Sequence, residues 1–124
     1  MALVINDVQN KATIKLQQGS DLSIVFDLVN FTATLVGATG RGKIKRTVSS
    51  ATTEASFVCA VDSGAKEMTA TLLADDSSAI VLDTSTTAKR VITTMSYDIE
   101  LVFADDVVVR LLWGECEIIP EVTN

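Results

Sequence analysis

Residues 22–28 read LSIVFDL, and apolar side chains alternate with other side chains along this stretch. Leu22, Ile24, Phe26 and Leu28 occupy every second position, so an extended backbone places all four on one face. A two-residue period of this kind predicts a β-strand with one face committed to a core.

The same two-residue period recurs downstream, between turn-forming clusters of Gly, Ser, Thr and Asp. The clearest repeats are residues 43–48, 55–61, 68–72 and 91–101. We count seven to nine short strands and almost no helical periodicity, which predicts an all-β chain folded as an antiparallel β-sandwich. We expect one sandwich domain over residues 11–124, preceded by an N-terminal arm or edge strand at residues 1–10.

Finer features follow from local chemistry. Residues 73–80 predict a short helical turn with Asp75 or Asp76 as its N-cap. The alternation slips near Trp113-Gly114, which predicts a bulge or bend at Gly114 and inward-facing Cys116. The residues expected in the core are Leu22, Ile24, Phe26, Leu28, Ile44, Phe57, Cys59, Met68, Leu72, Tyr97, Ile99, Leu101 and Trp113.

The composition excludes several kinds of catalytic and metal-binding site. The chain has no histidine and only two cysteines, so neither a zinc cluster nor a histidine base is available. The first fifteen residues lack the apolar run of a secretory signal, so we expect Cys59 and Cys116 to be free thiols in a protein made in a reducing cytoplasm. No apolar run is long enough to span a membrane.

Charge is distributed unevenly. Residues 98–124 carry seven acidic side chains against Arg110 alone, which accounts for the whole net charge of −6. A basic run precedes them, made of Arg41, Lys43, Lys45 and Arg46. One interpretation is that both clusters are solvated sheet faces. The other is that they are complementary contact surfaces in an assembly, and the candidate interaction residues are then Arg41, Lys43, Lys45, Arg46, Glu115 and Glu117.

Catalytic and cofactor motifs are incomplete. Gly37 to Lys43 matches part of a phosphate-binding loop, but Ile44 stands where a hydroxyl is needed and a strand pattern follows instead of a helix. The acidic pairs at residues 75–76 and 105–106 suit turns better than a calcium loop. We therefore expect no enzyme activity, no cofactor, no metal site and no nucleic-acid binding, although ion binding by one acidic loop stays open.

Three segments, taken together, carry a family resemblance. They are Gln18 to Leu28, Leu35 to Lys45, and Tyr97 to Leu101, the last followed by VRLLWG at residues 109–114 and IPEVT at residues 119–123. In order and spacing the chain resembles small virion proteins of tailed bacteriophages, and is similar to the N-terminal Ig-like module of phage upper baseplate and tail-fibre proteins.

This resemblance implies an Ig-like sandwich that serves as a structural part of the virion, assembled in the host cytoplasm. We expect a tail, baseplate or fibre-attachment adaptor that contacts other phage proteins, as a homo-oligomer or within a symmetric assembly. Residues 1–10 are a candidate arm for a neighbour's sheet edge. The alternatives are a head decoration or neck protein, and a β module that binds a host glycan or small ligand.

Overall fold

The computed structural model describes residues 2–5, 10–29, 31, 34–80 and 92–120. These residues form nine strands and one short helix, which confirms the all-β class. The elements are β1 (Ala2–Ile5), β2 (Asn10–Lys11), β3 (Ile14–Gln17), β4 (Leu22–Asp27), β5 (Thr39–Lys45), β6 (Ala55–Asp62), β7 (Glu67–Leu72), α1 (Ala74–Ser78), β8 (Thr93–Val102) and β9 (Val108–Ile119). Residues 1 and 6–9 of the expected arm lie outside the described residues.

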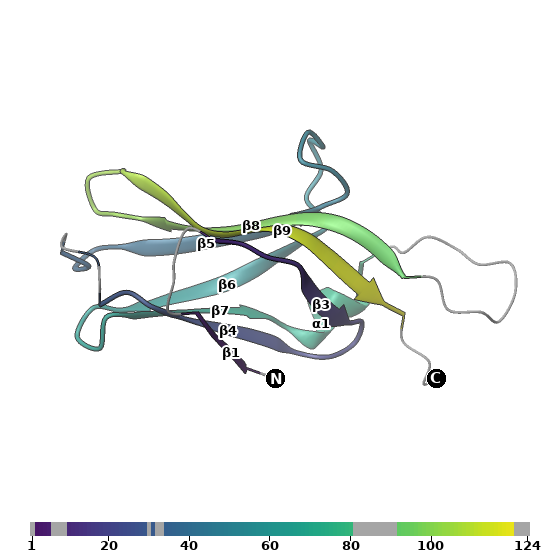
Figure 1. Ribbon diagram of the computed structural model, residues 1–124, viewed down its shortest axis with the longest axis horizontal. Helices are drawn as coiled ribbons and strands as arrows, with labels where there is room; N and C mark the ends of the chain where they lie inside the picture. Colours follow the sequence, from purple (N-terminus) through teal and green to yellow (C-terminus); the bar gives the residue numbers. More distant parts are fainter. Residues whose placement is uncertain (1, 6–9, 30, 32–33, 81–91, 121–124) are drawn as a thin grey trace, which may run out of the picture.

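The strands are hydrogen-bonded in the order β1-β4-β7-β6-β5-β8-β9-β2, and β3 also pairs with β9. In Figure 1 they form two layers, with β5, β8 and β9 in one and β1, β4 and β7 in the other. Strand β6 joins the layers, because its residues 55–57 pair with β5 and its residues 58–62 pair with β7. The sheet therefore closes almost into a barrel around one core.

The expectation of a wholly antiparallel arrangement was wrong at the N-terminus. Strand β1 runs parallel to β4, and β2 and β3 run parallel to β9. Parallel neighbours need a long crossover, and the chain provides one by visiting the other layer between β1 and β4. Alternation along a sequence reports which face a side chain occupies, so it carries no information on strand direction. Strand β1 lies at the sheet edge, beside β4 of its own chain.

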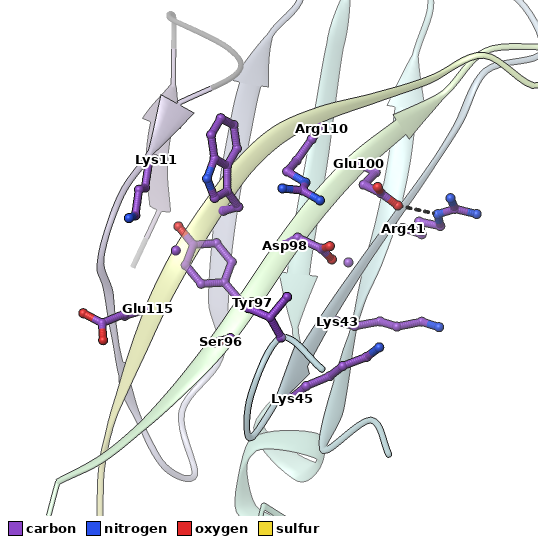
Figure 2. Close-up of a pocket in the computed structure, with 14 residues that line it drawn as sticks. Lys11, Arg41, Lys43, Lys45, Ser96, Tyr97, Asp98, Glu100, Arg110 and Glu115 are labelled. Atoms are coloured by element: carbon purple, nitrogen blue, oxygen red, sulfur yellow. Dashed lines mark hydrogen bonds and ion pairs between the residues drawn. The ribbon is translucent and has the colours of Figure 1, made fainter. Parts of the chain in front are cut away.

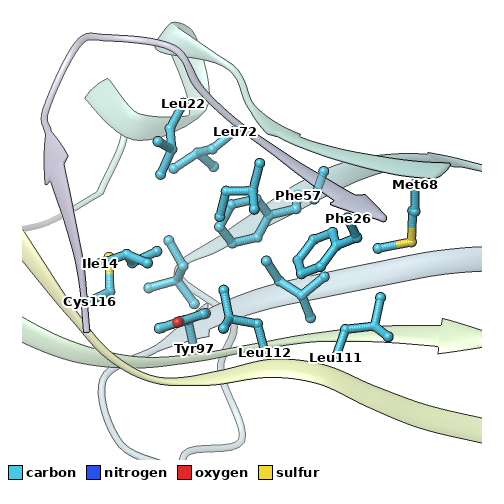
Figure 3. Close-up of a cluster of buried hydrophobic side chains, with 14 of the residues drawn as sticks. Ile14, Leu22, Phe26, Phe57, Met68, Leu72, Tyr97, Leu111, Leu112 and Cys116 are labelled. Carbon is cyan, nitrogen blue, oxygen red and sulfur yellow. The ribbon is translucent and has the colours of Figure 1, made fainter. Parts of the chain in front are cut away.

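The core lies between the two layers (Figure 3). There Leu22 of β4 and Leu72 of β7 lie on the side opposite Leu112 of β9. Eleven of the thirteen residues expected in the core are buried. The two exceptions are only partly buried: Cys59 still packs against the core, whereas Trp113 lines the outer face of the sheet, so the core prediction was wrong for Trp113.

A β-bulge in β9 explains why Trp113 leaves the core. The pairing with β8 shifts between Ile99 and Glu100, where Ile99 lies opposite Leu112 and Glu100 lies opposite Arg110. Leu111 is the extra residue, and both Leu111 and Leu112 are fully buried. The predicted bulge at Gly114 was therefore misplaced by three residues, because two adjacent inward leucines shift the alternation earlier than Gly114.

Helix α1 begins at Ala74, and its N-cap is Leu73, so the predicted caps Asp75 and Asp76 were wrong. Both acids lie in the first helical turn, where a negative charge interacts favourably with the helix dipole. The capping acceptor comes from a different part of the chain, since the Ala74 amide donates a 2.6 Å hydrogen bond to Asp21 Oδ1. This contact ties the helix to the turn before β4.

Candidate functional site

The outer face of the β5–β8–β9 layer consists of rows of charged residues that lie opposite one another on adjacent strands. In the first row, Arg41 of β5 lies opposite Glu100 of β8, which lies opposite Arg110 of β9. Arg41 Nε donates a 2.7 Å hydrogen bond to Glu100 Oε1 (Figure 2). Arg41 is 55% exposed, so this ion pair contributes about 0–1 kcal/mol to stability and mainly orients the two side chains.

Two further rows continue the pattern. In the second row, Lys43 lies opposite Asp98, and Asp98 lies opposite Trp113. Strand β2 adds Lys11, which lies opposite Trp113 on its other side. The third row consists of Lys45, Ser96 and Glu115. Asp98 and Glu100 of the central strand thus lie beside cations of β5, and Glu100 also lies beside Arg110 of β9, an arrangement that favours the pairing of these strands.

These rows line a groove with a volume of about 610 Å³. The loop between β5 and β6 stands above the face in Figure 1, and its Val48, 85% exposed, is part of the lining. Five of the chain's ten cationic side chains and three of its sixteen acidic ones line the groove. The groove therefore carries a net charge of about +2 on a chain with a net charge of −6.

Trp113 is the only tryptophan of the chain, and it lines this groove. The guanidinium of Arg110 lies 5.5 Å from the centre of the Trp113 ring, within the range of a cation–π interaction. A smaller hollow beside them is lined by Glu100, Val108, Arg110 and Trp113. The arrangement offers an aromatic surface bordered by donors and acceptors, which suits recognition of another molecule by contact.

The candidate interaction residues divide into two groups. Arg41, Lys43, Lys45 and Glu115 line the groove. Arg46 lies in the bend after β5, and Glu117 lies opposite Lys15 of β3, and both are outside the groove lining. The basic run and much of the acidic segment were expected as separate surfaces, but the structure brings them together as neighbours on one face.

Several groove residues were missed from the sequence. Trp113 was assigned to the core because the bulge was misplaced, and the adjacent leucines at 111–112 were the signal for its true position. Lys11 reaches the groove through parallel pairing of β2, which no local pattern predicts. Asp98 and Glu100 were counted as charges, yet their alternation with Ile99 already placed them on the outer face.

The glycine-rich segment allows close packing between neighbouring strands. Residues 39–45 form β5, with no helix following. A side chain at Gly42 would approach Ile99 and Phe57 to 3.0 Å, and one at Gly40 would overlap Met68. Glycine at both positions therefore permits close contact between β5 and its neighbours.

Both thiols are free. Burial raises the pKa of Cys59 to about 11, and burial together with the charge of Glu117 raises the pKa of Cys116 to about 12. Burial, and to a lesser extent Cys116, also raises the pKa of Tyr97. Because the thiolate is the reactive form, neither cysteine is activated as a nucleophile at neutral pH.

Among the described residues, no group of three or more Cys, Asp or Glu side chains is placed to hold a metal ion. The one described helix is too short to cross a membrane. In comparisons with known proteins, no protein-family model matches this chain and no curated protein matches it.

Proposed function

We propose that the chain is a structural component of a tailed-phage particle, an adaptor in the tail or baseplate linked to the fibres. In this proposal it contacts other virion proteins through the groove face and works within a symmetric assembly formed in the host cytoplasm. The observation that carries the proposal is the groove itself, where the partly buried Trp113 lies among rows of opposite charge. Tryptophan and arginine are the residues that most often dominate binding energy at protein interfaces.

The strand order supports an Ig-like form of the fold, which we propose as its finer class. The order β1-β4-β7-β6 in one layer and β5-β8-β9 in the other matches the A-B-E-D and C-F-G sheets of an immunoglobulin constant-type domain. Two pairings depart from that pattern, because β1 runs parallel to β4 and β6 also pairs with β5. The segments that resemble phage modules form β4, β5, β8 and β9, and three of these strands build the groove.

Reversing groove charges tests the proposed docking face. We expect Lys43→Glu with Lys45→Glu to abolish incorporation into particles, because the two substitutions turn a net charge of about +2 into about −2. The matched control is Lys15→Glu with Lys66→Glu, which makes the same charge change on exposed lysines outside the groove.

Each variant would be supplied in trans to a phage lacking the gene, and purified particles would be assayed for the chain by immunoblot. Equal melting temperatures exclude unfolding as the cause of a loss. Incorporation of the groove variant at the wild-type level would contradict the docking role. The part of the particle that retains the wild-type chain separates a tail or baseplate adaptor from a head decoration or neck protein.

A second candidate, a module that binds a host glycan, is favoured by one observation. Trp113 offers a ring face, with Asp98 and Glu100 nearby as hydrogen-bond acceptors for hydroxyl groups. Titration of purified host surface polysaccharide against Trp113 fluorescence distinguishes this candidate. Saturable quenching in the wild type that is lost in Asp98→Asn would support glycan binding. Unchanged wild-type fluorescence would contradict the glycan-binding candidate.

A further inference from the structure

The fold divides the acidic C-terminal segment between two places. Asp98, Glu100 and Glu115 lie within the groove, beside its cations. Asp105 and Asp106 instead lie at the tip of the β8–β9 hairpin, which projects from one end of the sheet in Figure 1. The tip therefore presents acidic groups that the groove of the same chain does not neutralise.

The hairpin tip is an ordered structure held by its own hydrogen bonds. The Phe103 amide donates to the Val107 carbonyl and the Asp106 amide donates to the Phe103 carbonyl, both at 2.9 Å. Asp105 Oδ1 accepts a 3.3 Å hydrogen bond from the Val107 amide. Phe103 packs edge-on against Phe31 with ring centres 6.0 Å apart, which anchors the turn to the core. A preorganised loop loses little entropy on binding.

The chemistry of the tip complements that of the groove. Both aspartates are exposed, and so is the apolar side chain of Val107, at 52%, whereas Val108 lines the hollow beside the groove. The groove offers unmatched cationic charge together with the Trp113 ring and Val48. In a contact between the two, the aspartates would lie beside the groove cations and Val107 would pack against the Trp113 ring.

We propose that the Asp105–Asp106 tip of one copy of this chain docks in the groove of a second copy. The inference rests on the proposed function and specifies its partner, making the groove the contact through which the chain associates with itself. The tip and the groove are different patches, so one copy can be bound through its groove while its tip binds another. Such a contact links copies into a ring or a chain unless two copies exchange tips.

Two variants with complementary defects test the proposal. Lys43→Glu with Lys45→Glu removes the cationic groove and keeps the tip. Asp105→Asn with Asp106→Asn removes the tip charge, and asparagine tolerates the positive φ of 68° at position 106 and keeps an oxygen acceptor at position 105. The readout is molar mass by sedimentation equilibrium at about 100 μM protein in low salt, where surface charges are weakly screened.

We expect the wild type to exceed the monomer mass and to return to monomer at about 1 M NaCl, where screening is strong. Each variant alone should be monomeric, and an equal mixture should form heterodimers, because one variant supplies a tip and the other a groove. A wild type that stays monomeric, a tip variant that associates like the wild type, or a mixture without heterodimers would each overturn the inference. If the particle assay still shows groove-dependent incorporation in that case, the proposed function stands and the groove holds a different protein.

Discussion

Arg110 and Trp113 are three residues apart on one strand, yet their side chains share a face, with the guanidinium 5.5 Å from the ring centre. In a regular strand, positions three apart point to opposite faces. The bulge at Leu111 removes this alternation by turning both leucines inward. The inserted residue thus places both leucines in the core and brings Arg110 and Trp113 onto the same outer face, where they form a cation–π pair.

Trp113 provides an intrinsic probe of that geometry. Because it is the only tryptophan and is only partly buried, we expect acrylamide to quench its fluorescence in the free protein. Removing the covering guanidinium by Arg110→Ala should increase the quenching constant, whereas Arg41→Ala, which removes a groove cation paired with Glu100 instead, should not. If the wild-type fluorescence resists quenching, the Trp113 ring lies in the core, which would contradict its placement on the groove face.

The hydroxyl of Tyr97 fixes the N-terminal border of the groove. It donates a 2.7 Å hydrogen bond to the carbonyl of Ala12, whose amide in turn donates to the Trp113 carbonyl at 2.8 Å. Tyr97→Phe leaves a partly buried carbonyl without this donor, so we expect a loss of about 1–3 kcal/mol in unfolding free energy. Urea denaturation measures it, and an unchanged midpoint would show that the bond does not form in solution.

Gly114 is required by backbone conformation and by space. Its φ is +145°, and a side chain there would overlap the Ala12 carbonyl oxygen. We expect Gly114→Ala to destabilise the protein more than Tyr97→Phe does, since it displaces the β2–β3 segment from β9. Gly64→Ala is the matched control, because its added carbon would come no closer than 3.5 Å to Asp62. Equal melting temperatures for the two alanine variants would refute this account of Gly114.

Burial of Cys116 predicts a loss of stability in alkali. Its pKa rises from 9.0 to about 12 in the folded protein, so between these values the folded state holds a proton that the unfolded state has released. Unfolding free energy is therefore fully retained below pH 9 and falls as pH rises, by about 1.4 kcal/mol per pH unit for one such group.

The raised pKa values of Cys59 and Tyr97 add declines of the same sign, which begin near pH 9 and pH 10 respectively. Denaturant titrations from pH 7 to 11 measure the combined effect. Cys116→Ala should lower stability at pH 7 through the lost packing and should show a shallower decline above pH 9. If the unfolding free energy of Cys116→Ala fell as steeply with pH as that of the wild type, the loss of stability in alkali would be due to other groups.

The sequence was sufficient where a feature depends on side-chain alternation. Burial of Ile24, Phe26 and Ile99 follows from a period of two and from the need of an apolar face for a core. The outward direction of Lys43 and Lys45 follows from the same rule. These features are local, so residues close in sequence determine them.

The sequence was insufficient where a feature depends on pairing between distant strands. The parallel pairing that brings Lys11 beside Trp113 is decided by the crossover between layers and leaves no local pattern. The position of the bulge was ambiguous because residues 107–112 are apolar except for Arg110 and show no clear alternation. Most of the groove was therefore present in the sequence as separate charges, and only the register of β5, β8 and β9 assembles them.

Site-specific photocrosslinking in the assembled particle tests most directly whether the groove face is the docking surface. A benzoylphenylalanine replaces Val48, which is 85% exposed beside the groove, or Val58, which is 57% exposed on β6 outside its lining. We predict that position 48 crosslinks to a neighbouring protein of the particle and that position 58 does not. Crosslinking at position 58 with none at position 48 would contradict the central claim.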